Sequence, residues 1–325
     1  MELTKVSETT YTFTMPSESV VVSAEFEEDE DAQSYISRAS VSVDGEIGVN
    51  LYIKPGNNIG SGYVMVKGPN DTDAKKVELT DVIFDTAEEA YKVSCPVYAP
   101  QMGEKVEFTL FDENNVQHEL WNSAKTSSYE TYRYAVNDYI ETVQNSEDSP
   151  EKLKAVTDKM QNFGAWARDS LIANNQISSD TAEIAEPKEV TGVADSIFDS
   201  NTVVKSTDFD VEGLNVSLFL DSETALRVYY TGDEINGITA KHGDETIALT
   251  SGTSRDMNYV EIKNISAYNL GDDYVITFGD KGTLKVSPYS YCCIVMNNSN
   301  DVKLKNTVKA LYEYCEAAKS FFDKQ

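Results

Sequence analysis

The sequence predicts a mainly β protein with helices (an α+β fold): two tandem, Ig-like β-sandwich modules that each end in a helical hairpin, preceded by a β-hairpin remnant. Three observations lead to this fold. Three segments occur twice in the same order, apolar residues alternate along short runs, and the apolar spacing changes to three and four residues near the end of each copy.

The repeat is the strongest of these observations. The paired segments are 41–52 with 218–229, 91–112 with 259–280, and 153–171 with 304–322. The offset between the copies shrinks along the chain, as expected if the second copy has shorter loops. A tandem repeat favours a modular surface or scaffold protein over an enzyme.

Residues 1–28 are predicted to form two strands around a turn, because apolar residues alternate with threonines before Pro16 and a valine-rich run follows it. Two strands alone are marginally stable, so this segment is expected to be the end of a β domain. The run TYTFTMPSESVVVSAEF resembles the closing strands of internalin-type B-repeats in Gram-positive surface proteins. The acidic stretch that follows is expected to be a solvated linker.

The first module is predicted at 37–175, with strands that alternate on either side of a two-residue hairpin turn at Asp44-Gly45. Its last strand-like run is expected at 129–136. A short helix, capped by Asn137 or Asp138, and a longer one then follow. Ser149 is expected to cap the longer helix, with Pro150 as its first residue.

Residues 176–208 are rich in serine, threonine and acids and are predicted to be a linker, one that could wrap along a module. The second module is predicted at 209–325 and repeats the plan, with a short helix that begins at Ser287-Pro288. Its final helix carries six apolar residues at heptad-like spacing, too few for a coiled coil. We expect this helix to dock on its own sheet or on the helix of the other module.

Both modules resemble a known type of surface module. The first copy contains SVSVDGEIGVNLYIK and LKAVTDKMQNFGAWARDSL, and the second contains LFLDSETALRVYY and LKNTVKALYEYCEAAKSFF. These runs resemble tandem β modules with helical tails from large surface proteins of anaerobic gut Gram-positive bacteria. The resemblance implies a protein that is extracellular or attached to the cell wall. It implies no catalytic residues.

Composition excludes several partner classes. The 325 residues carry 27 basic and 55 acidic side chains, a net charge of −28, which disfavours nucleic acid and anionic membrane surfaces. No apolar stretch approaches the roughly 20 residues of a membrane span, so direct membrane insertion is not expected. None of the four cysteines recurs at an equivalent repeat position, which favours free, buried thiols over framework disulfides.

Catalytic and metal motifs are weak. His118 and His242 lie apart from any nucleophile elbow and are expected to be solvated loop residues. With so many acids, a pair of carboxylates suited to glycosidase chemistry carries no information by itself. No cofactor is expected. The minority hypothesis is calcium, at Asp112 and Asn114 or at Asp272 and Asp273, although ordinary turns explain all four.

Aromatic residues give the remaining lead. Trp121, in a polar, loop-like setting, and Tyr129 and Tyr132 could stack on sugar rings. The alternative is that the tyrosines belong to the core. The leading functional hypothesis is a non-enzymatic adhesion module that binds glycans or host surface proteins. The alternative is a spacer that presents other domains, and a glycosidase is the least favoured. The sequence identifies neither a ligand nor an oligomeric state.

Overall fold

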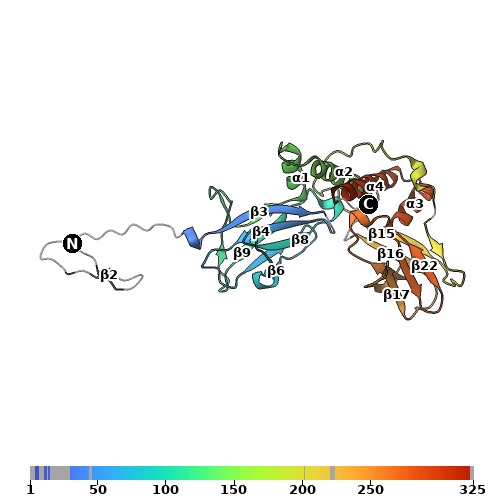
Figure 1. Ribbon diagram of the computed structural model, residues 1–325, viewed down its shortest axis with the longest axis horizontal. Coiled ribbons are helices and arrows are strands. Elements are labelled where there is room, and N and C mark those ends of the chain that lie inside the picture. Colours follow the sequence, from blue (N-terminus) through green and yellow to red (C-terminus); the bar gives the residue numbers. More distant parts are fainter. Residues whose placement is uncertain are drawn as a thin grey trace.

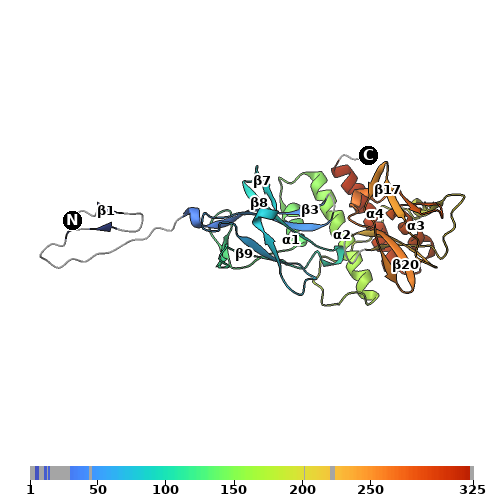
Figure 2. The same ribbon diagram turned by 90° about the horizontal axis from the view of Figure 1, so that it is seen from below.

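The computed structural model describes residues 4–6, 11–12, 14, 30–43, 46–200, 202–219 and 224–322. It confirms the mixed α+β fold with two β sandwiches and helical tails (Figure 1). The sandwiches lie on either side of a layer of helices, which is clearest in Figure 2. No helix of the described residues is both long and apolar enough to cross a membrane.

The first sandwich consists of two mostly antiparallel sheets. One has the order β12-β11-β3-β4-β8-β7: Ser128–Tyr129, Leu120–Trp121, Ser34–Ser42, Gly48–Lys54, Ala90–Pro96 and Ile83–Asp85. The other has the order β10-β9-β5-β6, with β13 also on β9: Gln117–His118, Val106–Phe111, Tyr63–Lys67, Lys75–Glu78 and Tyr132–Tyr134.

The second sandwich repeats this topology with fewer strands. One sheet has the order β15-β16-β20-β19: Asn215–Phe219, Ala225–Tyr230, Met257–Ile262 and Thr250–Ser254. The other has the order β14-β22-β21-β17-β18: Val204–Lys205, Thr283–Val286, Tyr274–Phe278, Ile238–His242 and Glu245–Ile247. The series β3-β4-β8-β7 therefore corresponds to β15-β16-β20-β19, as the sequence repeat requires.

Hydrogen bonds outside the strands repeat as well. The helices are α1 (Val136–Asn145), α2 (Glu151–Ala173), α3 (Pro288–Asn298) and α4 (Val302–Phe321). The backbone N–H of Asn137 donates to the carbonyl of Met102 at 2.9 Å, and that of Tyr289 donates to the carbonyl of Leu270 at 2.8 Å. Each bond ties a helical hairpin to a short 3-10 turn of its own module, η3 (Ala99–Gln101) or η5 (Ala267–Asn269).

Period-two alternation builds both cores. Val49, Leu51 and Ile53 of β4 are fully buried, and so are the repeat-equivalent residues Leu226, Val228 and Tyr230 of β16. Burial of aliphatic and aromatic side chains at about 25 cal/mol per Å² is the main force that holds such sheets together. One apolar core continues from the first sandwich through the helices, and the second sandwich has its own core.

Several local predictions need correction. Asp44 and Gly45, the predicted hairpin turn, lie outside the described residues; the described pairing of β3 with β4 extends to Ser42 and Gly48. Pro150 is the N-cap of α2 rather than its first residue, so Ser149 lies outside the helix. Neither Asn137 nor Asp138 is the N-cap of α1, because that helix begins one residue after Ala135.

Only short pieces of the amino-terminal segment are described. Strand β1 (Thr4–Lys5) pairs antiparallel with β2 (Tyr11–Thr12). The predicted turn at Pro16 and the valine-rich strand lie outside the described residues, as does most of the acidic linker. The resemblance to a B-repeat therefore stays a prediction.

The segment predicted as a linker is packed along the molecule. It contributes Ile184, Val190, Val193 and Phe198 to the core that runs through the helices. It also contains a 3-10 turn, η4 (Asp195–Phe198), and supplies the edge strand β14. Scattered apolar residues in a polar segment thus mark the points where it contacts the modules.

Candidate functional site

The predicted sugar-binding aromatics do not form one surface. Trp121 lies in β11, a short strand and not a loop, where it pairs with Ser128 and Tyr35. Tyr129 pairs with Leu120, which is fully buried. Because adjacent residues of a strand point to opposite faces, Trp121 and Tyr129 lie on opposite sides of the sheet.

The tyrosines form a row at the edge of the core. The rings of Tyr129 and Tyr132 meet edge to face with centroids 5.2 Å apart, and those of Tyr132 and Tyr134 stack at 6.0 Å. All three are half-buried against the core of the first sandwich. Burial raises the pKa of Tyr132 and of Tyr134 to about 12. This packing matches the alternative in which the tyrosines serve the core.

The calcium candidates of the first module are occupied by local hydrogen bonds. One carboxylate oxygen of Asp112 accepts the backbone N–H groups of Asn114 and Val116, both at 2.8 Å, and the other lies 3.3 Å from Nε2 of His118. These bonds, led by that from Val116, lower the pKa of Asp112. Asn114 itself is exposed.

The candidates of the second module are paired in the same way. Asp272 lies 3.0 Å from Nε2 of His242 and accepts a hydrogen bond from Asn269. Asp273 forms an ion pair with Lys285 at 2.8 Å. Both histidines are therefore partners of an aspartate rather than free loop residues. Among the described residues, no group of three or more histidine, cysteine or acidic side chains is arranged to hold a metal ion.

The cysteines are buried and free, as predicted. Loss of solvent raises the pKa of Cys95 and of Cys315 to about 11. A thiol with so high a pKa is almost fully protonated at neutral pH and is a poor nucleophile. These thiols therefore act as small apolar side chains of the core.

The two modules meet through α2 and α4, the second of the docking alternatives predicted for the final helix. Phe163 of α2 stacks on Tyr314 of α4 with centroids 6.0 Å apart, and both are almost fully buried. The Thr307 hydroxyl donates to the backbone carbonyl of Trp166 at 3.0 Å. An apolar contact of this kind, continuous with the core, couples the modules into one unit.

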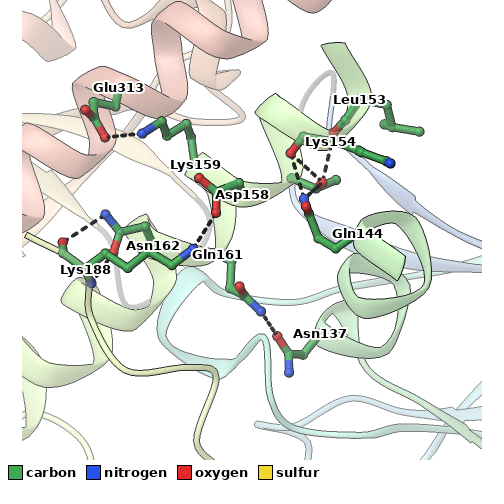
Figure 3. Close-up of polar contacts among 11 residues, drawn as sticks. Asn137, Gln144, Leu153, Lys154, Asp158, Lys159, Gln161, Asn162, Lys188 and Glu313 are labelled. Atoms are coloured by element: carbon green, nitrogen blue, oxygen red, sulfur yellow. Dashed lines mark hydrogen bonds and ion pairs between the residues drawn. The ribbon is translucent and has the colours of Figure 1, made fainter. Parts of the chain in front are cut away.

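Polar contacts surround this helix pair, and Figure 3 places them around α2. Lys159 pairs with Glu313 of α4 at 2.9 Å, and Asp158 pairs with Lys188 at 2.6 Å. The side-chain amide of Asn162 donates to the carbonyl of Lys188 at 3.2 Å and accepts its backbone N–H at 2.8 Å. Helix α2 therefore holds both α4 and the segment between the modules.

The same helix is tied to α1, as Figure 3 also shows. Gln161 donates to the side-chain oxygen of Asn137 at 2.6 Å, and Gln144 donates to the carbonyl of Lys154 at 2.7 Å. These bonds span the helical hairpin of the first module. With α2 fixed on three sides, the junction has little freedom to bend.

A groove of about 790 Å³ lies beside this junction. One wall is the outer face of β15 and β16, with the hairpin between β19 and β20. The other wall is the end of α2 together with α3 and the start of α4. Its aromatic and charged lining residues include Phe219, Arg227, Tyr229, Arg255, Tyr291 and Asp301. A volume of this size is in the range of small-molecule binding sites.

The wall formed by β16 is a stack of aromatic and charged side chains. The Arg227 guanidinium lies 4.0 Å from the ring centre of Phe219 and 3.9 Å from that of Tyr259. Its Nε donates to Glu261 at 2.7 Å, and Nη1 donates to the Tyr229 hydroxyl at 3.3 Å. Since Arg227 and Glu261 are 16% and 7% exposed, they form a largely buried pair that fixes this wall.

The first module lacks such an opening at the equivalent positions. Asn50 and Tyr52, which correspond to Arg227 and Tyr229, are 3% and 6% exposed. Asn50 is closed in by hydrogen bonds with Ser42 and Ser94, at 2.9 and 2.7 Å. The same strand thus has a sealed outer face in one module and a groove wall in the other.

Sequence reasoning missed the groove residues. One usable signal was that Asn50 of the first copy is replaced by arginine, Arg227, in the second. A charged residue at a position that is uncharged in the other copy indicates that the two positions have different environments. The pair Arg255-Asp256 between two strand-like runs was another. The groove forms because the helices leave part of the outer face of β15 and β16 uncovered. The sequence repeat does not reveal which sheet faces the helices cover.

No protein-family model matches the chain, and no curated protein matches it in sequence.

Proposed function

We propose that this chain is a rigid, non-enzymatic binding unit of an extracellular or cell-wall-attached protein, and that it holds a glycan in the groove beside the α2–α4 junction. The observation that carries this proposal is the groove itself, which has a fixed wall in the second module where the first module is sealed. Aromatic rings next to amide and hydroxyl groups are the usual lining of sugar sites.

The lining supports binding more than catalysis. Among the described residues that line the groove, Asp301 is the only acid. Its carboxylate accepts the side-chain N–H of Asn174 at 2.9 Å and caps α4 through the N–H of Leu304 at 3.1 Å. Glycoside hydrolysis by the common mechanisms uses two carboxylates that face each other across the bond that breaks.

A second function, that of a spacer, is favoured by the junction. The core that continues through α2 and α4, and the packed segment at 176–208, would keep the two sandwiches at a fixed separation. A spacer needs this rigidity and no ligand. The groove is therefore the one feature that distinguishes the binding function from the spacer function.

The test is glycan-array binding of three proteins: the unaltered chain, Ser217→Trp and Trp121→Ala. Ser217 lines the groove on the outer face of β15, so an indole there fills the space without removing a core side chain. Trp121 belongs to the first sandwich and tests the site predicted from the sequence.

We expect saturable binding that Ser217→Trp abolishes and Trp121→Ala leaves intact. Binding lost only in Trp121→Ala would move the site to β11 and overturn the groove proposal. A blank array for the unaltered chain would leave the spacer as the supported function. Circular dichroism of each variant establishes that it is folded.

A further inference from the structure

The hairpin between β19 and β20 places an unusual residue at the groove. Ser254 pairs with Met257, so the connection is the two-residue turn Arg255-Asp256, with φ angles of 53° and 61°. Such turns favour asparagine and glycine, because other residues in the left-handed region cost about 1 kcal/mol or more. Turn geometry therefore does not explain an arginine here.

Arg255 is also an isolated charge. Its side chain is exposed, and within the described part of the chain it makes no hydrogen bond or ion pair. Arg227, by contrast, is compensated by Glu261. Asp301 is committed to Asn174 and to the cap of α4, so among the described residues that line the groove Arg255 is the cation without a side-chain partner.

The charge of the whole chain makes this cation more notable. The protein carries a net charge of −28 and has only five arginines, two of which line the same groove. A surface of this sign repels anions in general. An anionic ligand would therefore be retained only where a local cation faces it.

We propose that the groove binds a saccharide that carries a carboxylate, with Arg255 as its charge anchor. This inference rests on the glycan-binding function proposed above. The planar guanidinium matches a carboxylate with two parallel N–H···O bonds, which makes such pairs both strong and directional. Two exposed amide side chains of the lining, Gln176 and Asn215, are available for sugar hydroxyls.

The test uses two variants of one turn, Arg255→Asn and Asp256→Asn. Both introduce asparagine at a position with positive φ, which that residue tolerates, so the backbone is preserved. The first removes the proposed anchor, whereas the second removes the neighbouring negative charge. Binding is measured by titration with matched acidic and neutral ligands: sialyllactose with its methyl ester, and trigalacturonate with its methyl ester.

We expect the unaltered chain to prefer the acidic member of a pair. Arg255→Asn should lower that affinity by about tenfold, the ordinary effect of losing one charge-assisted pair. Asp256→Asn should keep or increase the affinity, and rising salt should weaken the preference.

Glycan binding that Ser217→Trp abolishes but that shows no acidic preference would overturn this inference and leave the proposed function standing. Equal losses of acidic and neutral binding in Arg255→Asn would also overturn it, since they indicate a change of shape. Absence of all glycan binding would overturn both proposals together.

Discussion

Gly164→Ala tests how closely α2 is pressed against the turn η3. Alanine is a better helix former than glycine by about 1 kcal/mol, so helix propensity alone predicts a more stable protein. A Cβ at this position, however, would lie 2.7 Å from the backbone carbonyl oxygen of Ala99 and also against the end of the Met102 side chain. Methionine can move, but the backbone of a packed turn cannot.

Overpacking of this kind costs about 1–3 kcal/mol, which exceeds the gain in propensity over most of its range. After the propensity gain of about 1 kcal/mol is subtracted, we expect Gly164→Ala to lower the free energy of unfolding by about 1 kcal/mol, and by at most about 2 kcal/mol, and the melting temperature by a few degrees. The free energy of unfolding is measured by urea titration, with tryptophan fluorescence as the signal. The control is Ala155→Gly at an exposed site of α2, which should cost about 1 kcal/mol through propensity alone.

A Gly164→Ala protein that is as stable as the unaltered chain, or more so, would contradict this prediction. It would mean that α2 can move away from η3 at no cost. The junction would then be looser than the contacts indicate, and the two sandwiches would not form a rigid unit.

Three further predictions concern other parts of the molecule. Gly103→Ala should cost about 1–3 kcal/mol, because its Cβ would meet the carbonyls of the packed segment, whereas the repeat-equivalent Gly271→Ala has open space and should be neutral or slightly stabilising in thermal unfolding. Asp301→Ala should cost about 1 kcal/mol at pH 7 through loss of the α4 cap. The hydrogen bond from Asn174 and the cap lower the pKa of Asp301 from its ordinary value of 3.8. The stability that the Asp301 carboxylate contributes is therefore present above pH 3.8 and is lost as the pH falls through the folded-state pKa. Urea unfolding at pH 7 and pH 3 should show that the stability difference between Asp301→Ala and the unaltered chain shrinks at the lower pH. Millimolar Ca²⁺ should leave the melting temperature unchanged, since Asp112, Asp272 and Asp273 are already paired, and a rise in calorimetry would contradict this.

The sequence predicted those parts of the fold that depend on local pattern. Alternation placed Leu51 and Val228 in the cores, and three-and-four spacing placed Phe163 and Val308 on the buried faces of their helices. Helix starts were harder: Ser149-Pro150 is the usual pattern of a cap followed by proline at the first helical position, yet α2 begins one residue later, at Glu151.

The candidate site was largely beyond sequence reasoning. Trp121 and Tyr129 are close in the chain, but strand register puts them on opposite faces. The groove depends on how α2, from the first module, lies against a sheet of the second. Contacts between residues so distant in sequence leave no periodic signal. Arg227 could be noticed only as a departure from the repeat, and Arg255 only as part of a charged pair between two strand-like runs.

The joint between α2 and α4 also sets an order of events during synthesis. Lys159 and Glu313, which pair across it, are 154 residues apart in the chain. At about 5–20 residues per second, a ribosome needs roughly 8–30 s to produce α4 after α2. Throughout that interval the apolar stripe of α2 around Phe163 has no partner helix. We therefore expect a chain truncated before α4 to expose this apolar stripe and to aggregate more readily than the full chain.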